Sequence, residues 1–229
     1  MTSERELALF LVSINFEINN DEDMIYNMKK SIQLDSHLNS DELDLLSQIC
    51  KKIIKQYINS IKSIELIEKT VKTIYYEKLI KYKEHIVKEF INFCNEIIEM
   101  TESQIVPKED VESKNAFLSL RGDIYGYISQ YKSQDEKKEY VNKAINCYER
   151  AFEDADQDIF DGYATMKLDN KYAVFLHDII GNKLFAITFL QNELDRYNAG
   201  VVYDDDKRDY CLSEMKYNLL TWKKCEGLE

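Results

Sequence analysis

The stretch ESKNAFLSLRGDIYGYISQYK, from Glu112 to Lys132, decides the fold class. Its spacing of apolar residues predicts a helix, yet it carries Gly122 and Gly126 four positions apart. An interior glycine destabilises a helix by roughly 1 kcal/mol relative to alanine. The reason for these two glycines therefore bears directly on what the helix does.

Helical periodicity also dominates the rest of the chain, and one proline and six glycines leave little room for the turns of an all-β fold. We therefore expect an all-α fold, with residues 1–229 forming a single domain of about nine antiparallel helices. The expected helices are the following: one through Leu7, Phe10, Leu11, Ile14 and Ile18; a second after the acids of NNDED; a third capped by Ser40 and running towards Glu68; a fourth from Val71 to Thr101, broken by TESQIVPKED around Pro107; a fifth from Val111 to Tyr131; a sixth opening at SQDE; a seventh ending near Gly181; an eighth ending near Asn198 to Gly200; and a ninth through Tyr210 and Trp222.

Composition and charge exclude several classes of partner. The 229 residues carry 30 basic and 42 acidic side chains, a net charge of −12, which repels nucleic acid and anionic membranes. No apolar run reaches the roughly 18 residues of a membrane-spanning helix. The five cysteines lie far apart in the sequence, and Cys50, Cys94 and Cys147 occupy apolar helical contexts. Reduced, buried thiols are expected, which favours a cytoplasmic protein.

The sequence lacks the motifs of common enzymes and cofactor sites. It has three histidines, no Cys-x-x-Cys, no glycine-rich phosphate loop and no nucleophile elbow. No residue three positions before a histidine is a glutamate, so the di-iron signature of helical bundles is missing. We therefore expect no catalytic residue, no metal and no cofactor.

Several polar sets lie at helical spacing. Lys51, Lys55, Ile58 and Lys62 share one face of the third helix, which is either a solvated surface or an anion site. Other sets consist of Asp123, Gly126, Tyr127 and Gln130 on the fifth helix, of Lys171, Val174 and Asp178 on the seventh, and of Asn218 on the ninth. A phenol donates to phosphate oxygens, and an amide can hold a peptide backbone.

These residues stand within motifs that resemble the 14-3-3 family. ESKNAFLSLRGDIYGYI is similar to the family's fifth-helix signature, LDLLSQICKKI to its third-helix signature and YNLLTW to the end of its last helix. NDEDM, IEKT and YKEHIVKEF fall where the family has counterparts, so the resemblance runs from about Ser3 to Trp222. It implies a dimer of nine-helix subunits that binds phosphopeptides in a concave groove and has no enzymatic activity.

The resemblance also implies roles for individual residues. The peptide- and phosphate-binding positions fall on Lys51, Lys62, Asp123, Tyr127, Lys171, Val174, Asp178 and Asn218. Lys55, about one turn from Ile58, is expected to add a further cation to this site. The dimer-interface positions fall on Ile14, Ile18, Asp23, Ile64, Tyr82, His85 and Glu89. We expect Asp23 to meet His85 across the seam. Gly122 is the family's own glycine, which predicts close contact between helices.

The chain departs from the family pattern at the phosphate pocket. The two arginines of that pocket fall on Ile58 and Gly126, and a lysine of the fifth helix falls on Ser119. In the last helix, Tyr210 and Glu214 replace apolar groove positions, and the seam arginine becomes Asn20.

We therefore expect a homodimeric adaptor that binds phosphorylated or acidic segments of client proteins with weak or altered phosphate dependence. The alternative is a phosphorylation-independent helical scaffold that binds acidic or helical partner segments. The sequence predicts neither nucleic acid nor membrane as a partner.

Overall fold

The computed structural model describes residues 3–35, 38–102, 111–155, 163–199 and 206–228. Within these ranges the chain forms nine α-helices, one π-helix and no strand, so the expected all-α class is confirmed. None of the described helices is long and apolar enough to cross a membrane. The chain separates into two compact units, residues 1–113 and 114–229, and the single-domain organisation stays a prediction. The expected break around Pro107 lies outside the described residues.

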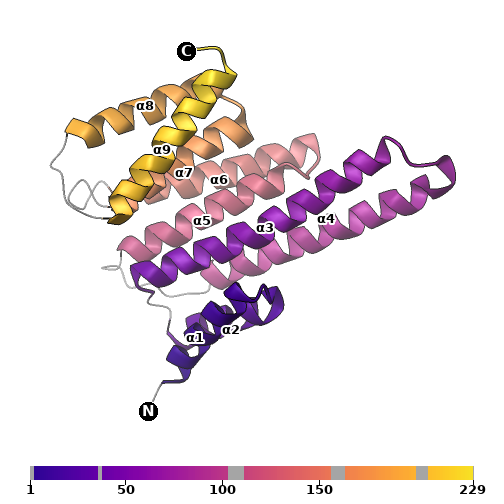
Figure 1. Cartoon of the computed structure of the whole chain (residues 1–229), viewed down its shortest axis with the longest axis horizontal. Helices are drawn as coiled ribbons and strands as arrows, with labels where there is room; N and C mark the ends of the chain where they lie inside the picture. The colour runs from indigo at the N-terminus through magenta and orange to yellow at the C-terminus, as the bar shows by residue number, and fades with distance from the viewer. Residues whose placement is uncertain (1–2, 36–37, 103–110, 156–162, 200–205, 229) are drawn as a thin grey trace. The chain divides into compact units, whose positions relative to one another are not determined.

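The first unit is built from two helical pairs. Its helices are α1 (Glu4–Glu17), α2 (Asp21–Leu34), α3 (Ser40–Glu68) and α4 (Thr73–Glu102). Helices α1 and α2 pack side by side, and the long helices α3 and α4 form an antiparallel pair (Figure 1). Apolar side chains from all four helices form the core of this unit, and they include Val12, Met28, Ile49 and Phe90.

Side-chain caps fix where these helices begin. Ser3 caps α1 in a capping box with Glu6, and Asn20 caps α2 by accepting a hydrogen bond from the Asp23 amide. The prediction that Ser40 caps the third helix is wrong. The Asn39 side chain accepts a hydrogen bond from the backbone amide of Glu42, and the Glu42 carboxylate accepts one from the backbone amide of Asn39. Ser40 is therefore already the first helical residue.

The apolar pattern that predicted the first helix does not face the core. Ala8, Val12 and Asn15 are the buried residues of α1. The larger apolar side chains at helical spacing are exposed, with 51% exposure at Leu7, 61% at Phe10, 39% at Ile14 and 64% at Ile18. Helix α1 therefore turns one side to the core and leaves an apolar side exposed, which is the kind of face that marks interaction surfaces.

The second unit contains the remaining helices. They are α5 (Val111–Ser129, whose first residues belong to the first unit), α6 (Gln134–Ala155), α7 (Tyr163–Val174), the π-helix η1 (Phe175–Ile180), α8 (Lys183–Ala199) and α9 (Asp206–Cys225). Helices α7, α8 and α9 pack around one apolar cluster that includes Leu190, Met215 and Trp222. A second cluster joins α5, α6, α7 and η1 through Leu118, Tyr148 and Phe175.

The seventh helix does not run as one α-helix to Gly181. After Val174 it widens into the π-helix, which ends at Gly181 in the left-handed conformation, with φ +76°. Glycine reaches this conformation without steric cost, which explains its place at the turn. The buried cysteines Cys50, Cys94, Cys147 and Cys211 are free thiols, as predicted for the first three.

Gly122 is confirmed as a point of close helix contact. A Cβ atom at Gly122 would lie 2.8 Å from Cε2 of Tyr148, whose ring is fully buried. We expect Gly122→Ala to lower the free energy of unfolding by about 1–2 kcal/mol, because overpacking outweighs the gain in helix propensity. Urea denaturation checks this. Gly126→Ala is the matched control: its Cβ atom would lie 3.1 Å from Cδ2 of Phe175, and we expect it to lose less stability than Gly122→Ala. Equal stability of Gly122→Ala and the wild type would contradict the prediction.

Candidate functional site

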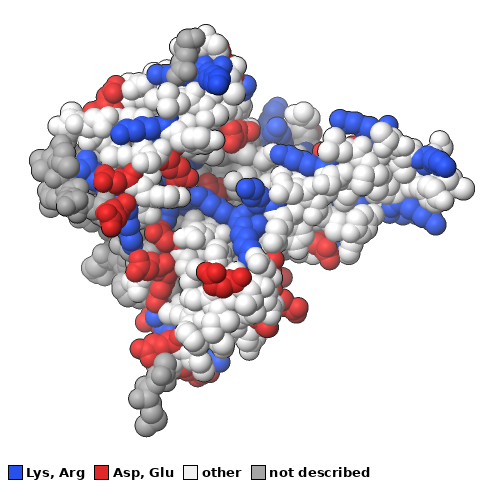
Figure 2. All heavy atoms as spheres, in the orientation of Figure 1, with Lys and Arg blue, Asp and Glu red and all other residues white. Residues whose placement is uncertain are grey.

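The lysine set of α3 lies on the surface of the first unit. Lys51, Lys55 and Lys62 are exposed, and Ile58 between them is half-buried. None of the three lysines forms an ion pair with any described acidic residue, so their ammonium groups remain available to an external anion. Basic side chains also spread along the outer part of the α3–α4 pair on the face shown in Figure 2.

Two contacts hold three of the predicted residues of the second unit, namely Asp123, Lys171 and Asn218. The first joins α5 and α7 and contains Asp123 and Lys171. The Lys171 Nζ lies 3.4 Å from Oδ2 of Asp123 and donates to Oγ of Ser119 at 3.2 Å. The Lys171 side chain is only 8% exposed. An acidic partner at this distance neutralises much of the charge of this buried ammonium group.

Asp123 has a further partner that the sequence analysis missed. The hydroxyl of Tyr148, on α6, donates to Oδ1 of Asp123. Gly122 makes this contact possible, because the Tyr148 ring packs directly against its bare backbone. A glycine one residue before a carboxylate in a helix was therefore the available signal, although nothing in the sequence pointed to Tyr148 itself.

Tyr127 lies one turn beyond Asp123 on α5 and is half-buried. Burial raises the pKa of its phenol well above the ordinary value, and the negative charges of Asp123 and Asp178 raise it further. The phenol therefore stays protonated at neutral pH. It can donate a hydrogen bond to an oxygen of a phosphate or carboxylate.

The second contact joins α7 and α9 through two amides. Asn218 Nδ2 donates to Oδ1 of Asn170 at 3.0 Å. Asn170 was not among the predicted residues, because the resemblance placed the asparagine of the seventh helix on its neighbour Lys171. Asn218 is therefore oriented by a partner, and its own Oδ1 is left to accept a further hydrogen bond.

The π-helix changes the expected register of the α7 set. Lys171 and Val174 precede it, whereas Asp178 lies inside it and is exposed. Asp178 Oδ1 lies 2.6 Å from Nδ1 of His177. Because a π-helix has more residues per turn than an α-helix, Asp178 is rotated from the face that an unbroken α-helix would give it.

Gly126 stands where the resemblance implies an arginine. Its backbone packs against the π-helix, and a Cβ atom there would lie 3.1 Å from Cδ2 of Phe175 and 3.5 Å from Cγ1 of Ile179. Any side chain at this position would have to displace the Phe175 ring by a few tenths of an ångström.

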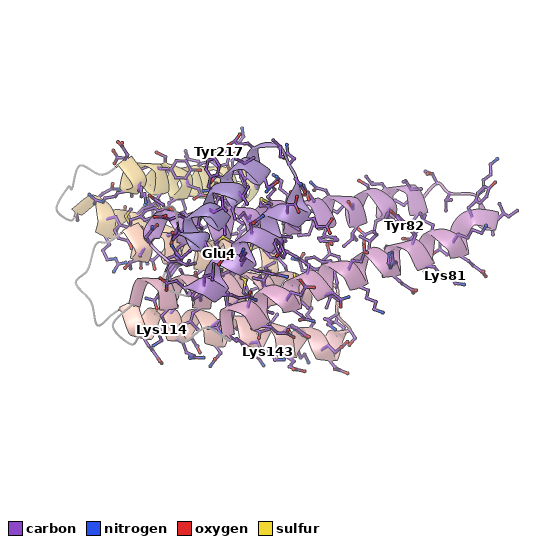
Figure 3. The ribbon with its side chains drawn as sticks, turned by 90° about the horizontal axis from the view of Figure 1, so that it is seen from below. Glu4, Lys81, Tyr82, Lys114, Lys143 and Tyr217 are labelled. Carbon is purple, nitrogen blue, oxygen red and sulfur yellow. The ribbon has the colours of Figure 1, made fainter. Side chains whose placement is uncertain are left out.

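The predicted seam residues of the first unit differ in exposure. Ile14, Ile18 and Tyr82 are exposed, whereas Ile64 is buried. Figure 3 shows Tyr82 and Lys81 as neighbours on the outer half of α4. Exposed apolar side chains continue towards the end of the pair, at Leu66, Ile67, Ile74, Tyr75 and Tyr76.

The charged seam residues pair within the unit. Asp23 accepts a hydrogen bond from Nδ2 of Asn20 at 2.8 Å. His85 Nε2 lies 3.4 Å from Oε1 of Glu89, one turn along α4. Asn20 is thus engaged as the cap of α2, and Glu89 has a partner on its own helix.

Comparison with known proteins identifies the family. The model of the 14-3-3 protein family matches residues 11–223. A 14-3-3 protein of Giardia intestinalis is 27% identical over 187 residues, which cover 78% of this chain and 75% of the relative. The 14-3-3-like protein GF14 epsilon of Arabidopsis thaliana is 24% identical over 201 residues, covering 85% of this chain and 79% of the relative. The 14-3-3-like protein RA215 of Solanum tuberosum is 26% identical over 213 residues, which cover 88% of this chain and 82% of the relative. The helical order and the family match together show that this chain belongs to the 14-3-3 family of non-enzymatic adaptors that bind partner proteins.

Proposed function

We propose that this 14-3-3 chain binds segments of client proteins through two residue sets, with little dependence on phosphorylation. The first set is Lys51, Lys55 and Lys62 of α3. The second is Asp123, Tyr127, Lys171, Val174, Asp178 and Asn218 of the second unit. The observation that carries the proposal is the exposure of three α3 lysines without an acidic partner among the described residues.

We expect weak phosphate dependence because two positions of the phosphate pocket lack an arginine, whose planar guanidinium group can make two parallel hydrogen bonds. Ile58 and Gly126 occupy the positions that the resemblance assigns to arginine. An arginine–phosphate pair makes two parallel hydrogen bonds, whereas a lysine acts as a point charge. A hydrogen bond to a charged group contributes roughly 1.5–3 kcal/mol, so the loss of two such contacts weakens phosphate binding by about two to four powers of ten.

The phosphate dependence is tested by titrating the protein with a phosphoserine peptide and with its unphosphorylated twin in isothermal calorimetry. We expect the two affinities to differ by less than about tenfold, with both weaker than micromolar. Lys55→Glu should weaken the binding of both peptides. Lys69→Glu reverses the charge of an exposed lysine at the end of α3 and serves as the control, which should leave both affinities unchanged. A sub-micromolar affinity that requires the phosphate would overturn the proposal.

One observation favours the alternative, a scaffold for unphosphorylated acidic or helical segments. Lys171 is buried and held by Asp123 and Ser119, so its charge is already matched inside the protein. A dianionic phosphate would have to compete with Asp123 for this ammonium group. A carboxylate from an acidic segment requires less compensating charge and is satisfied by the exposed lysines of α3.

The chain assembles as a homodimer in this proposal, through the exposed face of α1 and the outer surface of α4. Leu7, Phe10, Ile14 and Ile18 line one side of α1 at helical spacing, and Tyr82 is 55% exposed on α4. Burial of these side chains stabilises the dimer, because each fully buried large apolar side chain contributes about 1.5–3 kcal/mol.

We expect Phe10→Glu to weaken dimerisation at least tenfold, since it places a charge in the apolar face. Light scattering over a concentration series measures the mass of each variant. Leu220→Glu on α9 exchanges a similarly exposed side chain outside the proposed seam and should leave the mass unchanged. A wild-type chain that stays monomeric at tens of micromolar would refute the seam, and so would a Phe10→Glu variant with the wild-type mass.

A further inference from the structure

A cleft lies within the second unit, between the beginning of α6 and the π-helix. Its volume is about 370 Å³, which falls in the range typical of ligand pockets. The lining residues are Gln134, Lys137, Lys138, Val141, Asn142, Ile179 and Ile180. None of them belongs to the residue sets of the proposed function.

The π-helix forms the apolar side of the cleft. Its last two residues are Ile179 and Ile180, and Ile180 remains 37% exposed. The turn that follows is closed by Gly181 and by a hydrogen bond from the Asn182 amide to the Leu176 carbonyl at 3.0 Å. Val141 of α6 adds a third apolar side chain. The apolar side of the cleft, which we call its floor, is therefore held in place by a hydrogen-bonded turn.

The other side of the cleft is basic. Lys137 and Lys138 form no ion pair with a described acidic residue. The acids nearest in sequence are engaged elsewhere. The Glu136 carboxylate accepts hydrogen bonds from the Ser133 hydroxyl and from Lys132. The Glu139 carboxylate forms an ion pair with Nζ of Lys143 at 2.6 Å. Asp178, next to the apolar floor, is bound to His177. Asp135 does not line the cleft.

From this combination we infer that the cleft is a docking site for an acidic segment of a partner protein that carries an aliphatic side chain beside its carboxylates. The aliphatic group packs on Val141, Ile179 and Ile180, and the carboxylates meet Lys137 and Lys138. Asn142 and Gln134 supply amides that hydrogen-bond the backbone of the segment. Charge complementarity is local, because the chain as a whole carries −12 and repels extended polyanions.

The two-sided lining selects against simpler ligands. Inorganic phosphate gains nothing from the apolar floor, and a purely apolar peptide leaves the lysines unmatched. A short segment that combines both features uses the whole cleft. The site is independent of the α3 lysines, so it can exist whether or not the proposed function is correct.

The test uses the full chain labelled at isoleucine methyl groups, titrated by NMR with the peptide acetyl-Asp-Leu-Asp-Glu-amide. We expect saturable shifts of the Ile179 and Ile180 methyl signals. The twin acetyl-Asn-Leu-Asn-Gln-amide should bind at least tenfold more weakly, and so should acetyl-Asp-Ser-Asp-Glu-amide. Inorganic phosphate at the same concentration should leave these signals in place.

Charge-reversal variants locate the contact. The double variant Lys137→Glu with Lys138→Glu should bind the acidic peptide at least tenfold more weakly than the wild type. The control pair Lys216→Glu with Lys224→Glu changes the net charge equally from exposed positions on α9 and should stay within twofold of the wild type. Equal binding by both double variants would overturn the inference. So would phosphate shifts that match those of the peptide, or peptide shifts that leave both methyl signals unmoved. Lys55→Glu, which tests the proposed function, should have no effect here.

Discussion

Ile58→Arg is expected to tighten binding of a phosphoserine peptide about ten- to a hundredfold, while binding of the unphosphorylated twin changes little. The new guanidinium would stand on α3 between Lys55 and Lys62, at a half-buried position that bears no polar group. A bidentate contact with phosphate contributes roughly 1.5–3 kcal/mol, and every 1.4 kcal/mol corresponds to about a factor of ten. Fluorescence anisotropy with the two peptides measures the change.

The matched control for this substitution is Ile58→Lys. It adds the same charge without the planar fork, so its gain should be clearly smaller. Equal gains from arginine and lysine would show that charge alone limits phosphate binding. Equal tightening of both peptides by Ile58→Arg would mean that position 58 does not face the phosphate, and the assignment of the α3 lysines to the binding site would then be wrong.

The second large effect concerns Asp169, a carboxyl buried among α7, α8 and the beginning of α9. Its Oδ2 accepts from the Tyr197 hydroxyl at 2.5 Å and from Arg196 at 3.0 Å, and Glu193 lies beside the same arginine. Arg208 of α9 donates to the Tyr197 carbonyl. Burial raises the pKa of Asp169 to about 7, and the Glu193 charge adds to this, against the lowering effects of Tyr197 and Arg196.

The sign of the pH dependence follows from this raised pKa. Between the ordinary carboxyl pKa of about 4 and a folded value of about 7, the folded state binds more protons than the unfolded state. The stabilising contribution of Asp169 is therefore complete below pH 4 and is lost as the pH rises through 7. From pH 5 to pH 8 the loss is on the order of 2 kcal/mol.

Asp169→Asn should remove this part of the pH dependence. Urea denaturation at pH 5, 6, 7 and 8 gives the free energy of unfolding, and the difference between variant and wild type isolates the one carboxyl from all others. Asp135→Asn, at an exposed position on α6, is the control and should keep the wild-type slope. An Asp169→Asn variant whose stability falls with pH as steeply as the wild type would contradict the prediction.

Much of the fold was open to sequence reasoning because its signals are local. Apolar periodicity gave the helices, acids in first turns marked several beginnings, and Gly181 marked an end. The errors are also local in origin. Asn39 and Ser40 are both good caps, and only the backbone geometry shows that Asn39 takes the role. The apolar spacing of the first helix predicted the helix itself but not which side packs inward, which is the side of small Ala8 and Val12.

The candidate site was predictable only in part, because its contacts join residues far apart in the chain. The spacing of Lys51, Lys55 and Lys62 predicts a shared face at once. In contrast, the bond between Tyr148 and Asp123 joins α6 to α5, and that between Asn218 and Asn170 joins α9 to α7. The π-helix was also invisible, because no composition marks where a helix widens. It decides the register of Asp178 and creates the apolar floor beside α6.

The same π-helix places the imidazole of His177 flat against the indole of Trp222, with ring centroids 4.2 Å apart and planes 8° from parallel. Trp222 is the only tryptophan in the chain. Ultraviolet emission excited at the red edge therefore comes from one place in the fold, where the buried indole lies against an imidazole. Any event that separates α9 from η1 at His177 should change this emission, so the chain carries an intrinsic optical reporter of that contact without an added dye.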